Sequence, residues 1–397
     1  MLINRKTFIQ TGTLASASVM LPGFLQALSR KPSVPPGNKV LVIVQFNGGN
    51  DGLNTIIPVT NDIYYRERPR LAIDKTKTLT LTDDAGLHPA LVACKALYDE
   101  GNLAMLNTVG YPNPDRSHFR SMDIWQSGSQ SNEYIYTGWL GRYLDAQCSG
   151  CDKPTQIIEI DDMLSLAMKG KNYSGIATTD PKRLYNSSND PYYKQLIAGY
   201  QHGEETADYL YKTMGDAINS ASYIHDKSQL QAAGKNYPAT ELGKNLKTIA
   251  NLILSDINTK VYYLSLGSFD THINQEAQQK RLFMQFNDAI KAFTDDMKAQ
   301  HRFEDVLLMT FSEFGRRVGQ NASNGTDHGT ANNMFLISGA LKQKGFLNPL
   351  PDLADLIDGD LKYTVDFKSV YATVLANWLG ADDQKIIGKS YSKLKFI

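Results

Sequence analysis

The sequence VLVIVQF at residues 40–46, followed by NGGNDG at residues 47–52, decides the fold. The first stretch is continuously apolar and rich in β-branched residues, which is typical of a strand buried on both faces of a parallel sheet. The second stretch is polar and rich in glycine, so it predicts a loop that ends the strand. Asp51 then lies just beyond the carboxyl end of this strand.

Further apolar stretches alternate with segments of helical spacing. One predicted helix starts near His88 and ends near Gly101, another starts at Ser117, and a third carries an apolar face from Leu282 to Met297. Strands separated by helices predict an α/β fold with a mostly parallel sheet and helices on both faces. The later strands are expected at residues 103–109, 155–160, 260–266, 305–311 and 334–338.

The first 30 residues predict an export signal. A basic start at Arg5 and Lys6 precedes an uncharged, moderately apolar stretch to Leu28, and the order resembles a twin-arginine signal with Lys6 in place of the second arginine. The alternative is an ordinary N-terminal helix. We expect residues 31–38 to be a linker, residues 39–397 a single domain with a helical insertion around 138–243, and the exported chain to be periplasmic or secreted.

Composition narrows the function. The chain has 397 residues with 41 basic and 41 acidic side chains, so no cationic excess exists for a phosphate backbone and we expect no nucleic-acid partner. No segment after the signal is long and apolar enough to predict a stable membrane span. Cys94 fits a helical core position, whereas Cys148 and Cys151 suit a short disulfide better than an incomplete zinc site.

Acidic and histidine side chains follow three of the predicted strands. In open α/β sheets, ligands bind beyond the carboxyl ends of the strands, where side chains distant in sequence converge. Aspartate, glutamate and histidine are metal ligands, so we predict a divalent metal site, whose ion is zinc, manganese, calcium or magnesium. Taken singly, an acidic or histidine residue in such a loop would more simply be a loop cap or a satisfied polar residue. For Asp327 and His328 the alternative is a plain surface loop. The predicted ligands are Asp51, Asp270, His272, Glu313, Asp327 and His328.

Ser117 begins a predicted helix within the segment RSHFR, residues 116–120. The helix N-terminus together with Arg116 or Arg120 would hold an anion beside the serine hydroxyl, and a neighbouring metal would activate that hydroxyl as a nucleophile. The alternative for Ser117 is an N-cap. Arg316 and Arg317 would also meet an anion, or form a solvated pair.

Eight motifs along the chain carry a family resemblance. They are FNGGNDGLNT (46–55), LHPAL (87–91), RSHF (116–119), MDIWQSG (122–128), FDTH (269–272), SEFGRR (312–317), GTDHGTAN (325–332) and DFKSVYATVLANWLG (366–380). In these the chain resembles a bacterial exported family of unknown function within the alkaline phosphatase/sulfatase-like superfamily. The resemblance covers nearly the whole chain.

This resemblance implies roles for individual residues. It makes Asp51 a metal ligand, Ser117 the nucleophile, Asp270 and His272 a metal-binding pair, and His328 the final histidine of the superfamily pattern. Glu313 falls where the superfamily usually has Asp-His, and Phe314 replaces that histidine, which puts one metal site in doubt. The residues after Ser117 lack the pattern for formylglycine conversion, so an unmodified serine and phosphatase-like chemistry are expected.

Two functions follow. The first is an exported metal-dependent hydrolase of phosphate or sulfate esters, with a small anionic ester or a sulfated or phosphorylated glycan as substrate. The alternative is an exported, metal-containing binding protein without catalysis, which the loss at Phe314 favours. Trp125, Trp139 and Trp378 would stack on sugar rings in a glycan enzyme, although core packing is the expected use of tryptophan.

Overall fold

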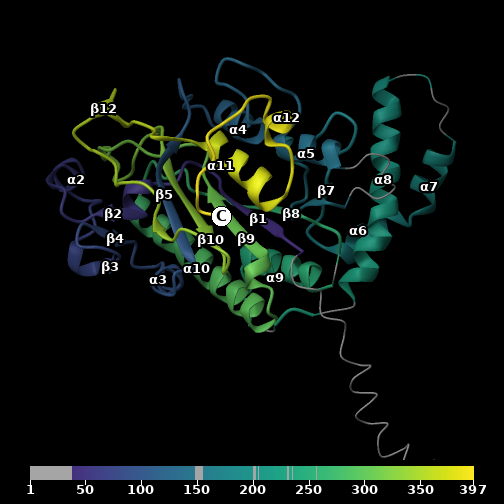
Figure 1. Cartoon of the computed structure of the whole chain (residues 1–397), viewed down its shortest axis with the longest axis horizontal. Helices are drawn as coiled ribbons and strands as arrows, with labels where there is room; N and C mark the ends of the chain where they lie inside the picture. The colour runs from purple at the N-terminus through teal and green to yellow at the C-terminus, as the bar shows by residue number, and fades with distance from the viewer. Residues whose placement is uncertain are drawn as a thin grey trace, which may run out of the picture.

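The computed structural model describes residues 38–147, 155–199, 203, 205–229, 232–234, 236–255 and 257–397. The predicted export signal, nearly all of the linker, and the pair Cys148 and Cys151 lie outside these residues. Within them, one large mixed sheet forms the centre of the molecule (Figure 1). Its strands are β1 (Val40–Phe46), β5 (Leu103–Gly110), β6 (Ile157–Glu159), β7 (Ile176–Ala177), β8 (Val261–Leu266), β9 (Val306–Phe311), β10 (Asn332–Ile337), β11 (Gly345–Phe346) and β14 (Val365–Asp366).

The sheet is mostly parallel, as predicted. The strand order is β11-β5-β10-β9-β1-β8-β6-β7, with β14 also on β5, and β1 pairs in parallel with β8 and β9. Only β10 runs against both of its neighbours, β5 and β9. The connection from β9 to β10 contains no crossover helix, and a strand that returns without one is antiparallel. Residues that precede β10 therefore lie at the same edge as residues that follow β1, β8 and β9.

Helices cover both faces of this sheet. On one face lie α3 (Val92–Asp99), α9 (Glu241–Leu254) and α10 (Gln275–Ala299), and on the other lie α4 (His118–Ser127), α5 (Trp139–Gln147), α11 (Phe367–Thr373) and α12 (Asp383–Ile387) (Figure 1). The expectation of an α/β sheet covered on both faces is confirmed.

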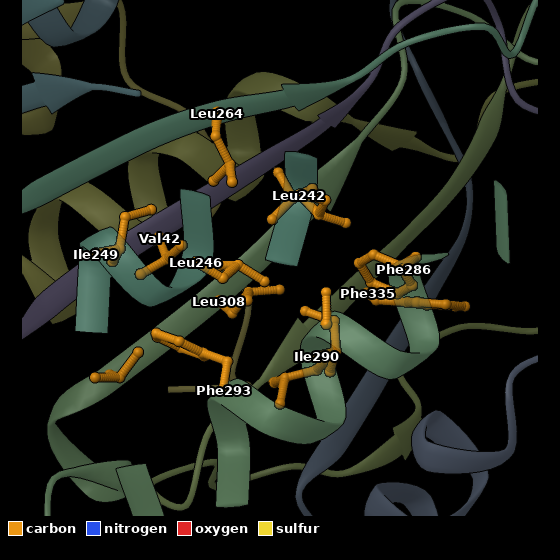
Figure 2. Packing of buried hydrophobic residues seen from close by; sticks show 14 of the residues in the cluster. Val42, Leu242, Leu246, Ile249, Leu264, Phe286, Ile290, Phe293, Leu308 and Phe335 are labelled. Carbon is orange, nitrogen blue, oxygen red and sulfur yellow. The ribbon is translucent and has the colours of Figure 1, made fainter. Parts of the chain in front are cut away.

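Alternation along β1 explains the two cores. Val42 and Val44 point to the face covered by α9 and α10, where Leu246, Ile290 and other apolar side chains pack against them (Figure 2). Leu41 and Ile43 belong to the second core under α4, α5 and α11. Burial on both faces is why the strand carries an unbroken apolar run instead of alternating polarity.

The three tryptophans are core residues. Trp125 stacks between Phe311 and Phe367, with ring centroids 5.0 Å and 4.2 Å away, and Trp139 stacks on Tyr371. The Trp378 indole donates to the Val40 carbonyl. Core packing is therefore confirmed for them. Cys94 is likewise buried with a free thiol.

The segment around 138–243, expected as a helical insertion, contains both strands and helices. It contributes β6 and β7 to the central sheet, and only its later part, with α6 (Pro181–Ser188), α7 (Pro191–Ala198) and α8 (Glu205–Ser228), stands at one side of the molecule (Figure 1). The remaining elements are short: α2 (Asp62–Glu67), the sheet of β2 (Ile56–Pro58), β3 (Leu79–Thr80) and β4 (Ala85–Leu87), and the hairpin of β12 (Leu356–Ile357) and β13 (Asp360–Leu361).

A bilayer-spanning helix would need a long apolar segment. No helix in the described part of the chain has the length and hydrophobicity for that.

Candidate metal centre

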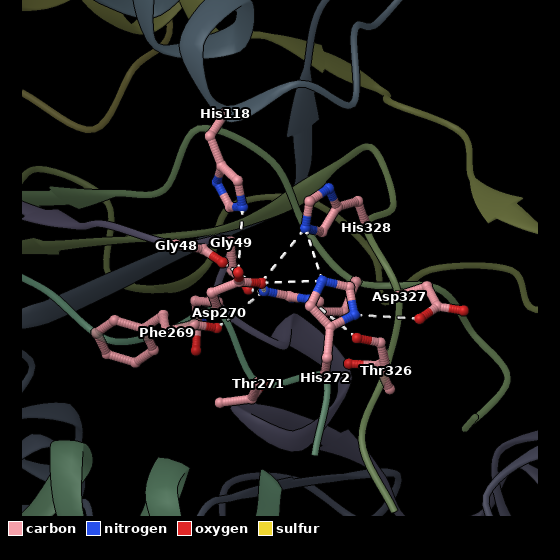
Figure 3. Close-up of polar contacts among 12 residues, drawn as sticks. Gly48, Gly49, His118, Phe269, Asp270, Thr271, His272, Thr326, Asp327 and His328 are labelled. Carbon is pink, nitrogen blue, oxygen red and sulfur yellow. Dashed lines mark hydrogen bonds and ion pairs between the residues drawn. The ribbon is translucent and has the colours of Figure 1, made fainter. Parts of the chain in front are cut away.

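Three histidines and one aspartate meet at the edge where the parallel strands end. His118 is the first residue of α4, Asp270 and His272 follow β8, and His328 precedes the reversed strand β10 (Figure 3). We call these four residues the His/Asp group. One ligand atom from each of His118, Asp270 and His328 lies within 4.8 Å of the other two.

The Nε2 atoms of the group face a single carboxylate. His272 Nε2 lies 3.1 Å and His328 Nε2 3.3 Å from Asp270 Oδ1, and the two Nε2 atoms are 2.9 Å apart. His118 Nε2 is 3.6 Å from Asp270 Oδ2, too far for a hydrogen bond, and this buried nitrogen has no hydrogen-bond partner. Two ligands of a tetrahedral metal at ~2.1 Å lie ~3.4 Å apart, so these separations fit a shared cation.

Each imidazole is held through its other nitrogen. His118 Nδ1 lies 2.8 Å from Glu313 Oε1, and His272 Nδ1 lies 3.1 Å from Asp327 Oδ1. His328 Nδ1 donates to the Arg116 carbonyl at 2.8 Å. An Nδ1–H bound to an oxygen leaves the Nε2 lone pair free, which is the usual arrangement of histidines that bind metals. Glu313 and Asp327 were both predicted as metal ligands. They instead contact the Nδ1 atoms of His118 and His272, on the side of each ring away from the Nε2 atoms.

Arg316 fixes the aspartate. Its guanidinium is fully buried and lies 2.7 Å from Asp270 Oδ1, while it also donates to the carbonyls of Gly48, Gly49 and Thr326. The interpretation of Arg316 as half of a solvated pair is wrong, because one guanidinium holds together the loops after β1, β8 and β9. Gly48 allows the loop after β1 to lie directly against the backbone of the loop after β8, since a Cβ at Gly48 would overlap the Asp270 backbone.

The surroundings of Asp270, His328 and His118 shift their pKa values in different directions. Burial would raise the pKa of Asp270, but the hydrogen bond and charge of Arg316 outweigh burial and lower it. Burial lowers the pKa of His328. The hydrogen bond to Glu313 raises the pKa of His118, so a proton would compete with a metal at this residue.

Ser117 sits beside the group. It is the N-cap of α4, yet its side chain makes no capping hydrogen bond and is exposed. Its own N–H donates to Asp115 Oδ1 at 2.7 Å. The capping alternative therefore lacks its defining contact, and Ser117 directly precedes His118 at the start of α4.

The arginines divide into two kinds. The side chain of Arg116, 41% exposed, pairs with the buried carboxylate of Asp360, and Arg317, 42% exposed, lies 3.7 Å from the same carboxylate. Arg120 instead donates to the Gln130, Ser131 and Glu133 carbonyls. The structure thus uses Arg120 to hold the loop after α4, and does not bring its guanidinium to the His/Asp group.

Asp51 lies apart from the group. Its side chain is 1% exposed, and its Oδ2 is 2.5 Å from the buried Arg68 and also accepts from Gln275. Its Oδ1 accepts from the Leu53 N–H at 3.1 Å. Both oxygens are therefore occupied by protein donors.

Phe314 packs against the His/Asp group. Its ring centroid lies 4.8 Å from that of His118 and 4.7 Å from that of His328. The side chain that stands in place of a histidine thus packs against two imidazoles of the group. With Asp51 paired and this position apolar, the described residues at this edge gather one metal-binding group and no second one.

His118 was not predicted as a site residue, although the motif RSHF contains it and roles were predicted for Ser117, Arg116 and Arg120. Its place after the end of β5, as His272 follows β8, is a weak signal. Helix N-terminal histidines are common without a ligand role, so only its neighbours identify this one.

The family model described as "Protein of unknown function (DUF1501)" matches residues 101–390. A comparison with curated proteins found no match.

Solved structures with a similar arrangement include a phosphonate monoester hydrolase from Silicibacter pomeroyi, at 8% identity over 89% of this chain and 78% of the other, with a TM-score of 0.42. A sulfatase, PsFucS1, from Pseudoalteromonas sp. is 11% identical over 95% and 73%, with a TM-score of 0.40. A protein in the alkaline phosphatase superfamily from Vibrio parahaemolyticus is 10% identical over 90% and 71%, with a TM-score of 0.37. Similarity at this level assigns no substrate or residue role.

Proposed function

The chain belongs to the DUF1501 family, and we propose that it is an exported metal-dependent hydrolase of phosphate or sulfate monoesters with Ser117 as nucleophile. The observation that carries this proposal is the convergence of three imidazole Nε2 atoms on Asp270, one of them buried without a partner. Nitrogen-rich donor sets suit zinc or manganese better than calcium or magnesium.

The residues that would hold the cation are His118, Asp270, His272 and His328. When bound, the cation would supply Lewis acidity for the ester and lower the pKa of a neighbouring hydroxyl. The second ring nitrogens, held by Glu313, Asp327 and the Arg116 carbonyl, keep each imidazole oriented before substrate arrives.

Ser117 would perform the displacement. Its oxygen loses its proton to solvent and forms a bond to phosphorus or sulfur, the bond from that atom to the ester oxygen breaks, and the leaving alkoxide takes up a proton from solvent. Water then hydrolyses the seryl ester and restores the hydroxyl. The N–H groups of the first turn of α4 stabilise the negative charge on the transferred group.

Two arginines would attract the anion. Arg116 and Arg317 both face one buried carboxylate, Asp360, and each arginine side chain remains about two-fifths exposed, at 41% and 42%. Arg116 reaches the His/Asp group through its carbonyl bond to His328, and the Arg317 N–H donates to the Asp327 carbonyl. Both residues are therefore close to the group, and their partly exposed guanidinium groups complement an anionic ester.

The alternative is a metal-binding protein without catalysis. It is favoured by Phe314, whose ring fills a position that could otherwise supply another ligand, and by Asp51, whose oxygens are occupied. It predicts metal binding with no turnover of any ester.

The test measures metal content and ester hydrolysis separately. Purified protein is loaded with zinc or manganese, metal per chain is measured by mass spectrometry, and p-nitrophenyl phosphate and sulfate are assayed. We expect about one metal per chain, lost in His118→Ala, and turnover that is lost in Ser117→Ala while its metal remains.

Matched controls use residues away from the group. Ser187→Ala, an exposed serine on α6, should change neither quantity. His301→Asn, beyond the far end of α10, should also leave both unchanged, with asparagine tolerating the left-handed φ of 55° at that position. Full metal occupancy with no hydrolysis of a broad ester set would support the alternative function.

A further inference from the structure

A cavity of about 440 Å³ lies beside the His/Asp group. It extends from the end of β5 to the β12–β13 hairpin, and its walls come from residues 110–114, 116, 330–331, 357–358 and 361–363. Arg116 lines the cavity with its side chain while its carbonyl accepts from His328. Thr330, which also lines the cavity, is two residues from His328. Arg116 and Thr330 therefore place the cavity next to the chain segments that carry His118 and His328.

One wall of the cavity is apolar and partly aromatic. Pro112, Pro114, Ile357, Leu361 and Tyr363 line it, and Ile357 and Tyr363 remain 58% and 39% exposed. Large apolar side chains exposed beside a functional group are typical of ligand contact surfaces. The Tyr363 ring provides a flat face against which an apolar ring face can stack.

Three polar side chains in the same cavity have no hydrogen-bond partner within the described part of the chain. Asn113 offers an amide with donors and an acceptor, Asp358 offers a carboxylate that only accepts, and Tyr363 offers a hydroxyl. The other polar groups are already engaged: Lys362 pairs with Asp355, Arg116 with Asp360, and Thr330 donates to the Leu361 carbonyl. Asn113 and Asp358 are therefore the side chains left to bind a ligand beside the Tyr363 ring.

This combination defines the ligand chemistry. A sugar ring presents carbon–hydrogen groups on its faces and hydroxyl groups at its edge, so it matches a flat aromatic wall beside an unpaired amide and carboxylate. An aryl group would use the wall but gain no hydrogen bond from the exposed Asn113 and Asp358, so it forms fewer contacts than a sugar ring does. The charged side chains of the cavity are largely neutralised, so a second anion is not favoured.

We propose that this cavity is the subsite for the sugar ring of a glycan ester whose phosphate or sulfate group lies against the His/Asp group. Asn113 and Asp358 bind the ring hydroxyls, and Tyr363 stacks on the ring face. This assignment rests on the proposed function, because the ester must lie at the His/Asp group for its sugar to reach the cavity.

Affinities measured without turnover test the subsite. Zinc-loaded Ser117→Ala protein is titrated calorimetrically with the 6-phosphates and 6-sulfates of glucose, galactose, mannose and N-acetylglucosamine, and with phenyl phosphate and inorganic phosphate. At least one sugar ester should bind ~10-fold more tightly than inorganic phosphate, a gain that one ring contact and two hydrogen bonds can supply.

Substitutions then separate the contacts. Asn113→Gly and Asp358→Gly preserve the left-handed backbone at φ 52° and 53°. Each should weaken the sugar ester about fivefold and leave phenyl phosphate and inorganic phosphate unchanged, since only the hydroxyl contacts are lost. Tyr363→Ala should weaken both ring-bearing esters. His301→Gly, which has the same backbone class at φ 55° far from the cavity, is the matched control.

The proposal is overturned if no sugar ester binds better than phenyl phosphate, or if the two glycine variants bind the sugar ester as the parent does. Saturation-transfer NMR with methyl glycosides of the same four sugars on metal-free protein separates this outcome from failure of the proposed function. Contact with the methyl glycosides that depends on Asn113 and Asp358, in a chain that neither retains metal nor hydrolyses esters, would reject the hydrolase and keep the sugar site.

Discussion

The loops after β1 and β8 each place an aspartate at the same edge of the sheet, on neighbouring strands, and the two aspartates serve different purposes. Asp51 is 1% exposed and bound by Arg68 and Gln275. Asp270 is 48% exposed and shared between Arg316 and the imidazoles of His272 and His328. Identical chemistry at equivalent positions is thus structural in one loop and available to a ligand in the other.

A third carboxylate extends the comparison. Glu159 ends β6, which lies beside β8 in the sheet, and its Oε2 accepts from the Ser165 N–H at 2.7 Å. Burial raises its pKa to about 7, and the Ser165 N–H and the charge of Lys169 offset the lost solvation only in part. The role of a carboxylate at this edge therefore depends on its partner: a buried guanidinium, a half-buried histidine group, or a backbone N–H.

The largest expected effect comes from breaking the Asp51 pair. Arg68→Ala leaves a buried carboxylate without its cation and should lower the free energy of unfolding by about 3–5 kcal/mol. Urea denaturation of metal-free protein measures this. Arg66→Ala, in the exposed pair with Glu67, is the control and should change stability by less than ~1 kcal/mol. A small loss in Arg68→Ala would mean that the Asp51 pair is not structural.

The second effect concerns Glu159 and pH. Its folded pKa of about 7 lies above the ordinary value of 4.5, so the folded state holds a proton that the unfolded state releases. The stability that this proton provides is complete below pH 4.5 and is lost as pH rises to about 7, by about 3 kcal/mol in total. Glu159→Gln should remove this dependence.

Chemical denaturation of the parent and Glu159→Gln between pH 4 and 8 tests the shift. The difference between the two chains isolates Glu159 from every other titrating group. Parallel curves for the two proteins would contradict the assignment.

The third effect compares the contributions of Asp270 and Asp51 to zinc affinity. Asp270→Asn keeps the side-chain shape but removes the charge that faces three imidazoles. Zinc affinity should fall by at least ~100-fold, because even the residues that orient metal ligands contribute ~10–100-fold. Competition with a fluorescent zinc chelator measures the affinity. Asp51→Asn is the matched control, and any folded Asp51→Asn protein should bind zinc as the parent does.

The smallest effect tests orientation of His118. Glu313→Gln can present an amide N–H to Nδ1, which would favour the ring form that carries its proton on Nε2. Zinc affinity should fall by ~10-fold, and the same chelator competition measures it. An unchanged affinity would show that Glu313 supports the loop through the Gly48 N–H and does not orient the histidine.

Sequence patterns were sufficient for much of the fold. The apolar runs gave strands within a few residues of those observed, and the place of Asp270 and His272 at the carboxyl edge followed from parallel strands. His118 was missed because one histidine at a helix N-terminus carries no distinguishing pattern. The reversal of β10 was also unpredicted, although it brings His328 to this edge from the other strand direction.

The partners of the predicted residues could not be read from the chain. Asp51 meets Gln275 across 224 positions, and Arg316 joins three loops through carbonyl groups that any sequence provides. Arg116 and Arg120 lie four residues apart, yet one pairs with Asp360 and the other holds a neighbouring loop. Such pairings depend on the relative placement of distant loops.

By itself, the sequence determined which segments are buried strands, which edge collects polar side chains, and the types of chemistry available there. It could do so because periodicity and turn composition are local properties that burial and backbone geometry impose directly. The tertiary structure alone decided which carboxylates are occupied and which imidazoles converge. Those outcomes depend on distances of a few ångströms between groups remote in sequence, and electrostatic and hydrogen-bond energies are decided at that range.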